Sequence, residues 1–432
     1  MTIQIMISFI VIILMIVGFV SEIWPLWVTA MLGCVAFFVT GIISSSQVWS
    51  GFSNDTVFMI AGTMIVGEAM FQTGAAQFIG TRIVKAVGYN ERRMIFVLVL
   101  AAGVLSAFTS NSSVMAMFIP LIRSVAASSD GRIKGKHVVM PVGISSMVGG
   151  ACTIVGSTPQ LVAQGLLEQY GLRQFTFFEL GYIGWPLLLI LALWFSTIWY
   201  KPLCKSVAWM PDEPDYIREM KQKAAENKDA EQKVNPRMYV CIGIVIVMVC
   251  LFLSGIWTSG TIAVISGLAC IVTGCIQAKT AFQKMGWNSL VVVGATLGVA
   301  KGLNESGAAE FIARSIVNAI GTKASIWVIM AVFGFMVCVM SNLLSHTATI
   351  SLLVPIMIPL AAEMGLDGTL FIYAIAHFVM CGYATPLGVA SYAMTLSEGY
   401  SFKDYQKIGG PFNILAYIIL VVFCVMRFKF GF

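Results

Sequence analysis

A long internal repeat, in which both copies place polar residues inside apolar sequence, constrains this chain more than any other feature. Residues 67–88 align with residues 300–321 at a constant offset of 233. Farther along, Ser-Asn-Ser at 110–112 aligns with Ser-His-Thr at 345–347. A repeat on this scale indicates a protein built from two related halves. In an apolar chain it is typical of membrane carriers, whose binding site lies where the halves meet.

The composition predicts a membrane protein. The 432 residues are 58% hydrophobic and only 11% charged, and apolar runs long enough to cross a bilayer, about 17–25 residues each, recur throughout. The net charge of +6 is spread over short loops, so it does not indicate a nucleic-acid-binding patch. We expect an integral membrane protein of the bacterial inner (plasma) membrane.

The apolar runs predict the fold class: an all-α polytopic membrane protein with about ten spans plus two re-entrant hairpins, arranged as two inverted repeats. A polar segment at 201–237, with eight Lys or Arg and seven Asp or Glu, separates the two halves. The expected spans lie near 3–20, 24–43, 55–70, 137–168 (interrupted) and 181–200 in the first half, and near 238–255, 258–276, 288–303, 368–397 (interrupted) and 408–427 in the second.

Two segments, 94–122 and 325–361, fit poorly as ordinary spans. Arg93 precedes the first and Arg123 follows it. Because cytoplasmic loops collect Lys and Arg, both ends of this segment are expected on the same side. Two equal helical legs would each reach roughly 20 Å, short of the ~30 Å hydrocarbon core. We therefore expect a hairpin with its polar turn at 110–112 inside the membrane, and by repetition a second one with its turn at 345–347.

Five spans and one hairpin in each half give an odd number of crossings, so the second half is expected upside down relative to the first. With the N-terminus outside, 20 of the 26 Lys and Arg residues fall on the inner side, as the positive-inside rule requires. The expected organisation is a first repeat over 1–200, a cytoplasmic connector over 201–237 and a second repeat over 238–432.

The interrupted spans and the hairpin turns define a polar set at membrane depth. Residues 149–160 (GGACTIVGSTPQ) and 381–388 (CGYATPLG) combine glycine, hydroxyl residues and proline, which break helices. Helix N-termini at such breaks favour an anion, while exposed carbonyls and hydroxyl oxygens suit a hard cation such as Na⁺. These four segments predict a site for a small anion and a co-bound cation.

The cysteines and the remaining histidines are weaker signals. Most of the ten cysteines lie in apolar runs and no Cys-x-x-Cys pair occurs, so they are interpreted as small hydrophobes rather than zinc ligands or disulfides. His377 is expected to be packed and hydrogen-bonded, and His137 to be solvated at a loop edge. No HExxH motif or intramembrane Asp pair occurs, which argues against an intramembrane enzyme.

At these residues the chain resembles the divalent anion/sodium symporter family of the ion transporter superfamily, which includes sodium-dicarboxylate, citrate and sulfate carriers. The resemblance covers about residues 55–427. It rests on LSAFTSNSSVMAMFIPL (105–121), GGACTIVGSTPQLVAQGLL (149–167), SHTATISLLVPI (345–356) and YATPLG (383–388). The resemblance implies a homodimer that works by an elevator motion, with Na⁺ as coupling ion and no other cofactor.

The resemblance also implies roles for individual residues. The positions that match the first sodium site are Ser106, Ser110, Asn111 and Gly156, and those that match the second are Ser341, Ser345, His346 and Ala384. The expected substrate contacts are Asn111, Ser112, Ser157, Thr158, His346, Thr347, Thr385 and Pro386.

This sequence departs from the family pattern at three places: His346 replaces an Asn, Gln160 replaces another Asn, and Leu387-Gly388 replaces a Pro-Asn pair. The expected function is secondary active transport of a small divalent anion, such as a C4-dicarboxylate, a citrate-like acid or sulfate, with sodium symport by an elevator mechanism. An anion exchanger or a proton-coupled carrier, with His346 in place of a sodium-site Asn, remains the alternative. A channel is a further alternative, which inverted hairpins around one site disfavour.

Overall fold

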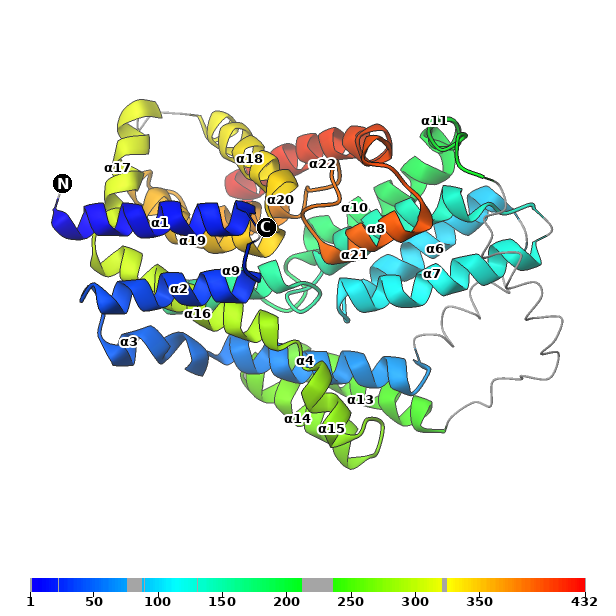
Figure 1. The fold of residues 1–432 in the computed structure, drawn as a ribbon, viewed down its shortest axis with the longest axis horizontal. Coiled ribbons are helices and arrows are strands. Elements are labelled where there is room, and N and C mark those ends of the chain that lie inside the picture. Colours follow the sequence, from blue (N-terminus) through cyan, green and yellow to red (C-terminus); the bar gives the residue numbers. More distant parts are fainter. Residues whose placement is uncertain are drawn as a thin grey trace.

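The computed structural model describes residues 2–21, 23–75, 88, 90–129, 131–211, 236–320 and 325–431. Within these residues every regular element is a helix and no β-strand is present (Figure 1). The all-α fold class expected from the sequence is therefore confirmed.

The described part of the chain contains five helices that are long and apolar enough to cross a membrane, and five shorter apolar ones. The long ones are Gly181–Ile198, Arg237–Ser254, Ile326–Leu343, His346–Glu363 and Phe402–Phe430. The shorter ones are Ile3–Phe19, Leu26–Val39, Asn111–Ala127, Ser259–Val272 and Gly368–Val379. A helix broken at its centre supplies two short pieces, so length alone undercounts the crossings of a chain with broken helices.

The first half begins with two apolar helices and ends in a short helix at the start of the polar connector. Its elements are α1 (Ile3–Ser21), α2 (Leu26–Val39), α3 (Ser45–Trp49), η1 (Ser50–Ser53), α4 (Asp55–Gln72), α6 (Glu91–Ser106), α7 (Asn111–Ser128), α8 (Gly135–Gly150), α9 (Thr158–Gln169), α10 (Gly181–Leu193), η2 (Trp194–Ile198) and α11 (Tyr200–Ser206). Residues 76–87, in the first copy of the repeat, and most of the connector (212–235) lie outside the described residues.

The second half repeats much of this order. Its elements are α13 (Arg237–Ser254), α14 (Ser259–Val272), α15 (Ala278–Lys284), α16 (Trp287–Glu305), α17 (Ala308–Ile320), α18 (Ile326–Leu343), α19 (His346–Glu363), α20 (Gly368–Val379), α21 (Ala390–Ala393), η3 (Met394–Glu398) and α22 (Phe402–Phe430). Helix α4 corresponds to α16, α6 to α18, α7 to α19 and α8 to α20.

Each of the two polar turns joins a pair of helices. The first turn joins α6 to α7 and the second joins α18 to α19, and Figure 1 places the first pair on the right and the second on the left, with the turns facing the middle of the molecule. The helices have 16 to 18 residues, or about 24–27 Å each. They are longer than the sequence suggested, so the polar turns identify these hairpins better than the lengths of their legs.

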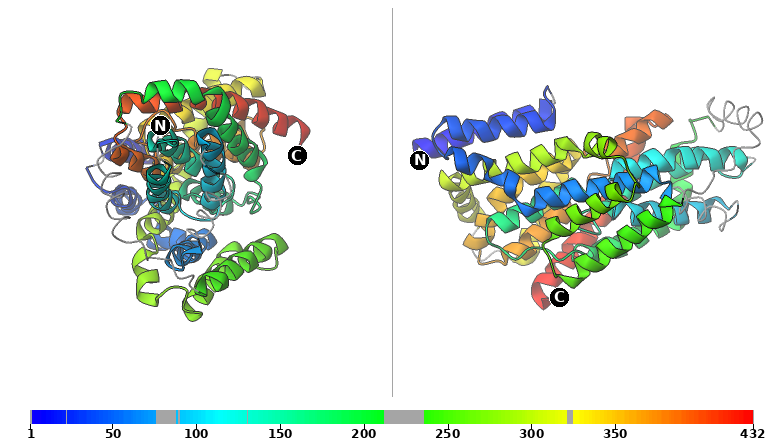
Figure 2. Two further views of the ribbon diagram at one scale, coloured as in Figure 1. Left: turned by 90° about the vertical axis from the view of Figure 1, so that its right-hand side faces the viewer. Right: turned by 90° about the horizontal axis from the view of Figure 1, so that it is seen from below.

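The two helix breaks lie beside the turns. The chain leaves helical geometry after Gly150 and resumes it at Thr158, and it does so again between Val379 and Ala390. Helix α8 packs along α6, and α20 packs against both α18 and α19. Figure 2 shows the described helices as an elongated bundle with α1 along one edge. Each hairpin is therefore held against the broken helix of its own half.

Candidate functional site

A cavity of about 350 Å³ lies where both hairpin turns meet both helix breaks. Such a volume suits a small ligand. Its lining comes from the two turns, the two breaks and the helices α2, α4, α9 and α16, and consists of Leu26, Thr63, Met64, Phe108, Thr109, Ser110, Asn111, Ser112, Val155, Gly156, Ser157, Thr158, Pro159, Leu161, Ser289, Ser345, His346, Thr347, Met380, Gly388, Val389 and Ala390. None of these lining residues is Asp, Glu, Lys or Arg.

Three helices begin at this cavity. Asn111 is the first residue of α7, Thr158 of α9 and His346 of α19, and all three line the cavity. The first N–H groups of a helix have no partner within the helix, and its N-terminus carries a partial positive charge. Three such termini give the cavity a positive potential without a charged side chain, which suits an anion.

The two turns are built alike because a serine caps each second leg. The Ser110 hydroxyl accepts a hydrogen bond from the backbone N–H of Ser113 at 3.3 Å. The Ser345 hydroxyl accepts one from the N–H of Ala348 at 3.2 Å. N-cap serine fixes where a helix begins, so both turns end, and both second legs begin, at the cavity.

At the first turn the Asn111 side chain reaches the break between α8 and α9. Its amide lies 2.7 Å from Ser106 Oγ and 3.0 Å from each of the carbonyl oxygens of Ser146 and Gly156. With its nitrogen facing these three oxygens, the amide has three acceptors within reach of its two N–H groups. With its oxygen facing them, the amide accepts from the Ser106 hydroxyl at 2.7 Å but also faces two carbonyl oxygens, an arrangement that a cation would stabilise.

Two glycines allow the first turn and the first break to approach closely. A Cβ atom at Gly150 would lie only 2.5 Å from the amide of Asn111, and one at Gly156 would lie 2.6 Å from Gly150 O and 2.9 Å from Ser106 O. Side chains other than hydrogen would therefore displace the first turn from the break.

The second turn uses the same frame with a different side chain. Gly382 and Gly388 lie 232 positions after Gly150 and Gly156, respectively. The ring of His346 lies between Gly382 and Gly388. A Cβ atom at Gly382 would lie 2.3 Å from His346 Nε2, and one at Gly388 would lie 2.8 Å from it. Both ring nitrogens of His346 are without a hydrogen-bond partner, and only 1% of the residue is exposed. The imidazole fills the space that the Asn111 amide occupies in the first half.

The other positions matched to sodium sites have protein partners of their own. The Ser106 hydroxyl donates to Ser146 O at 2.7 Å. The Ser341 hydroxyl donates to Val379 O, and the N–H of Ala384 donates to Asn342 Oδ1 at 3.1 Å. Of the eight positions matched to the two sodium sites, five line the cavity, namely Ser110, Asn111, Gly156, Ser345 and His346. The other three, Ser106, Ser341 and Ala384, are not among the lining residues.

The residues matched to substrate contacts divide in the same way. The cavity lining includes Asn111, Ser112, Ser157, Thr158, His346 and Thr347. Thr385 and Pro386 are not among the lining residues. The Thr385 hydroxyl instead donates to the carbonyl oxygen of Asn342 at 2.6 Å, so in this conformation it holds the second break against the second hairpin.

Asn342 is a residue that the sequence analysis missed. Its side-chain nitrogen donates to the carbonyl oxygens of Cys338 at 2.8 Å and Cys381 at 3.0 Å, and its side-chain oxygen accepts from Ala384. It therefore ties α18 to the second break. The sequence signal that could have identified Asn342 is its side-chain amide, which stands near the end of the mostly apolar helix α18, four residues before His346.

The two other histidines differ in how well the sequence described them. His377 is buried and lies 2.9 Å from Tyr373 O and 3.0 Å from Leu180 O, as expected of a packed histidine. The expectation for His137 was wrong: it is 6% exposed and its Nδ1 lies 3.1 Å from Glu91 Oε1. Its ring is buried beside Glu91 of α6 and Cys204 of α11, whose Sγ lies 3.7 Å from Nδ1.

The helices, the hairpin turns and the cavity define a class of protein. A polytopic helical membrane protein in which broken helices and two repeat-related turns surround one cavity has the architecture of a secondary transporter. Two solved transporter structures share this fold. They are the Alcanivorax borkumensis YdaH transporter (TM-score 0.57, 12% identity, covering 90% of this chain and 88% of that one) and Neisseria gonorrhoeae MtrF (TM-score 0.64, 12% identity, covering 100% and 96%).

The family model of citrate transporters, CitMHS, matches residues 13–377, and the chain belongs to this family. The chain is 24% identical over 430 residues to the sodium-dependent dicarboxylate transporter SdcS of Staphylococcus saprophyticus, covering 93% of this chain and 82% of that protein. It is 24% identical over 444 residues to the protein of the same name from Staphylococcus aureus, covering 95% and 84%. The resemblance to the divalent anion/sodium symporters seen in the sequence is thereby confirmed.

Proposed function

We propose that this protein is a secondary active transporter that carries a small divalent anion, a C4-dicarboxylate or a citrate-like acid, together with sodium. The observation that carries the proposal is the convergence of the N-termini of α7, α9 and α19 on a cavity without charged side chains. In a partly buried setting each terminus contributes up to about 2 kcal/mol to binding a negative charge. The names of the staphylococcal relatives support a dicarboxylate and sodium.

Recognition of the anion rests on neutral donors. The hydroxyls of Ser112, Ser157 and Thr347 line the cavity on three different elements. Hydroxyls and backbone N–H groups can each donate to a carboxylate oxygen. A site of this kind recognises where the two negative groups lie, and we infer that sulfate, which has one compact charged centre, binds more weakly than a dicarboxylate.

The first sodium ion is proposed to lie at the Asn111 cluster. Turning the amide so that its oxygen faces Ser146 O and Gly156 O would create the all-oxygen set that a hard cation prefers. When the ion leaves, the amide nitrogen can turn back and satisfy the same carbonyls. The site can thus be filled or empty without leaving buried acceptors unpaired.

The second turn favours a smaller number of coupling ions. Because the imidazole of His346 fills the space between Gly382 and Gly388, a cation cannot occupy the position that corresponds to the Asn111 amide. The described residues place no acidic side chain in the cavity lining, and a buried charge without a partner is costly. The imidazole is therefore proposed to be neutral, and sodium coupling is favoured over the alternative in which its charge replaces the ion.

We also propose four properties of the molecule as a whole. They are the division into repeats at 1–200 and 238–432 with a connector at 201–237, an elevator motion of the hairpins and broken helices, a homodimer and a location in the bacterial plasma membrane. The cavity supports the motion, because its lining combines hairpin residues with Thr63 and Ser289 from the continuous helices α4 and α16.

Uptake into proteoliposomes tests the proposal. Labelled succinate, citrate and sulfate are offered with an inward sodium gradient, with equal sodium on both sides, and with potassium in place of sodium. We expect saturable uptake of a di- or tricarboxylate that the sodium gradient drives above equilibrium. Uptake that requires a counter-anion inside the vesicles and does not depend on sodium would identify an exchanger. A flux that does not saturate with substrate concentration would identify a channel.

A further inference from the structure

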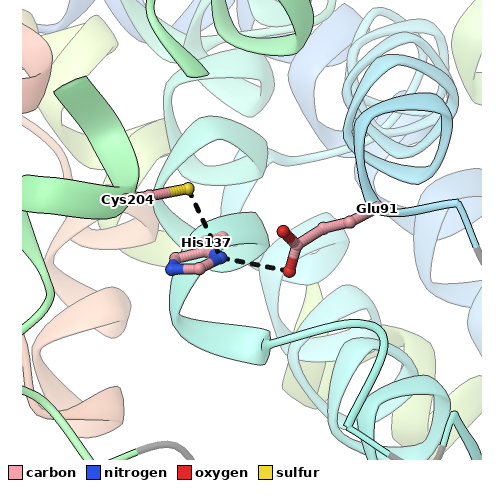
Figure 3. Close-up of side chains that lie close together, drawn as sticks. All are labelled: Glu91, His137 and Cys204. Atoms are coloured by element: carbon pink, nitrogen blue, oxygen red, sulfur yellow. Dashed lines mark hydrogen bonds and ion pairs between the residues drawn. The ribbon is translucent and has the colours of Figure 1, made fainter. Parts of the chain in front are cut away.

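A second cluster of chemically active side chains lies away from the transport cavity. Glu91, His137 and Cys204 come together at the base of the first hairpin, and Figure 3 shows all three side chains pointing toward a common point. Glu91 is the first residue of α6, His137 lies in the first turn of α8 and Cys204 lies in α11. None of them lines the transport cavity.

The spacing of the donor atoms fits a metal ion. His137 Nδ1 lies 3.1 Å from Glu91 Oε1 and 3.7 Å from Cys204 Sγ, and the three donor atoms all lie within 4.8 Å of one another. Zinc–nitrogen and zinc–oxygen bonds of about 2.0–2.2 Å and a zinc–sulfur bond of about 2.3 Å place tetrahedral ligand atoms roughly 3.3–3.6 Å apart. The two distances from His137 are already close to that range, and the separation of Glu91 from Cys204, at most 4.8 Å, would close by about 1 Å on binding.

The kinds of donor select the metal. A thiolate and an imidazole suit zinc and similar borderline ions, whereas magnesium and calcium prefer all-oxygen sets. A glutamate and a thiolate together balance the two charges of the ion, with the imidazole neutral. Three protein ligands leave a fourth position for water.

The surroundings orient the ligands. Glu91 Oε2 accepts a hydrogen bond from the Tyr200 hydroxyl, and Oε1 accepts one from the backbone N–H of Lys134 at 2.8 Å. Burial by itself would raise the pKa of Glu91, but the hydrogen bonds from His137, Tyr200 and Lys134 lower it below its ordinary value. Glu91 is therefore ionised and fixed in place, as a carboxylate ligand must be.

The thiol needs the metal to ionise. Burial raises the pKa of Cys204 above its ordinary value, so without a metal it is protonated at neutral pH. A bound dication would release that proton, as it does in other thiolate sites. Cys204 is partly exposed, which gives an ion a route from the solvent.

We propose that Glu91, His137 and Cys204 form a binding site for Zn²⁺ or a similar divalent transition-metal ion. Bound there, the ion would join the first turns of α6 and α8 to α11, and so fasten the base of the hairpin to the segment that leads into the polar connector. The site is independent of the transport cavity and of the anion that the cavity takes.

Metal binding to the purified full-length protein tests the proposal. Zn²⁺ is measured by equilibrium dialysis, and Co²⁺ by its absorption spectrum, in which a thiolate ligand adds an intense charge-transfer band. We expect one ion bound per chain and the thiolate band in the wild type. Cys204→Ser should abolish that band and weaken Zn²⁺ binding by more than about tenfold.

The matched control is Cys250→Ser, which alters an exposed cysteine on α13 and should leave both measurements unchanged. Equal Zn²⁺ binding by the wild type and Cys204→Ser, or equal losses in both serine variants, would overturn the proposal.

A labelling experiment uses the unaltered cysteine. Zn²⁺ should slow the reaction of Cys204 with a maleimide, read at the peptide level by mass spectrometry, and should leave the reaction of Cys250 unchanged. Glu91→Gln should remove this protection, with thermal melting to show that the variant is folded. If Glu91→Gln does not fold, the comparison of Cys204 with Cys250 in the wild type still tests the proposed site. A maleimide reaction rate of Cys204 that is the same with and without Zn²⁺ would contradict the site.

Discussion

Asn111 is the residue on which the proposed coupling depends, because its amide can either donate to the surrounding oxygens or join them around a cation. The three oxygens around it come from α6, α8 and the first break. A single side chain thus joins the hairpin to the broken helix. Removing it takes this donor from the buried carbonyl of Gly156, while Ser146 O keeps the hydrogen bond from Ser106. A buried acceptor left without a donor is more costly than the loss of one exposed hydrogen bond.

We expect Asn111→Ala to reduce apparent affinity by about 10- to 150-fold, since losing a buried hydrogen bond to a charged group costs about 1.5–3 kcal/mol. Initial uptake at low substrate and low sodium measures the loss. Asn304→Ala, which alters an exposed asparagine on α16, is the control. Unchanged affinity in Asn111→Ala would place the cation and the substrate elsewhere.

His346→Asn should increase the number of coupling ions, because it restores at the second turn the side chain of the first. We expect a steeper dependence of uptake on sodium concentration in the variant than in the wild type. The wild-type uptake should change little between pH 5.5 and 7.5 if the buried ring is neutral throughout. A wild type that already shows steep, cooperative sodium dependence, unaltered by His346→Asn, would mean that the ring does not exclude an ion.

At the scale of elements, each hairpin is held by a pair of glycines in a helix break rather than by helix packing alone. Gly150→Ala and Gly382→Ala would each place a methyl group closer than 3.0 Å to the turn side chain, so the turn must move out of the break. We expect uptake at low substrate to fall by more than about tenfold for a displacement of this kind, with a lowered melting temperature.

Gly243→Ala is the control for these variants, because a Cβ atom there meets nothing within 4 Å. It lies in α13, where alanine is favoured over glycine by about 1 kcal/mol, so its stability should be unchanged or raised. Normal transport by both Gly150→Ala and Gly382→Ala would show that the turns do not need this close fit.

The sequence predicted the elements better than the contacts between them. Apolar runs and Gly-Pro breaks located the hairpins and the interrupted helices. The hairpin legs are longer than the apolar runs indicate, because polar caps extend them. Asn90, for example, accepts a hydrogen bond from the N–H of Arg93 and starts α6 before the apolar run begins. The site was predicted in part: the turn residues face the cavity, while Thr385 turns away to bond with Asn342. Single residues on different helices, such as those of the proposed zinc site, carry no motif, so only the fold brings them together.

At the scale of the whole molecule, the proposed inverted arrangement predicts the side of the membrane from which each hairpin enters. In a cysteine-free background, single cysteines at Arg93 and Lys134 should react with an impermeant thiol reagent from the same face. Cysteines at Ser325 and Ala362, at the base of the second hairpin, should both react from the opposite face. Labelling of Arg93 and Lys134 from different faces would end the re-entrant model.

The proposed elevator motion predicts that a covalent link between a continuous helix and a broken one stops transport. The hydroxyls of Thr158 on α9 and Ser289 on α16 lie 3.3 Å apart, within reach of a disulfide after substitution by cysteine. Oxidation of the double variant should stop uptake and reduction should restore it. The uptake by each single variant should be the same with and without the oxidant. Full transport by the oxidised, cross-linked protein would show that these helices do not move apart.

The absence of Asp, Glu, Lys and Arg from the described cavity lining has an electrical consequence. When a binding site without fixed charge returns empty from one side of the membrane to the other, it moves no charge. The membrane potential then acts only on the charge of the bound substrate and ions. Each elementary charge moved is worth about 2.3 kcal/mol per 100 mV. A dianion with two sodium ions would then be moved without regard to voltage, and each sodium ion more or fewer would appear directly as a current of known sign.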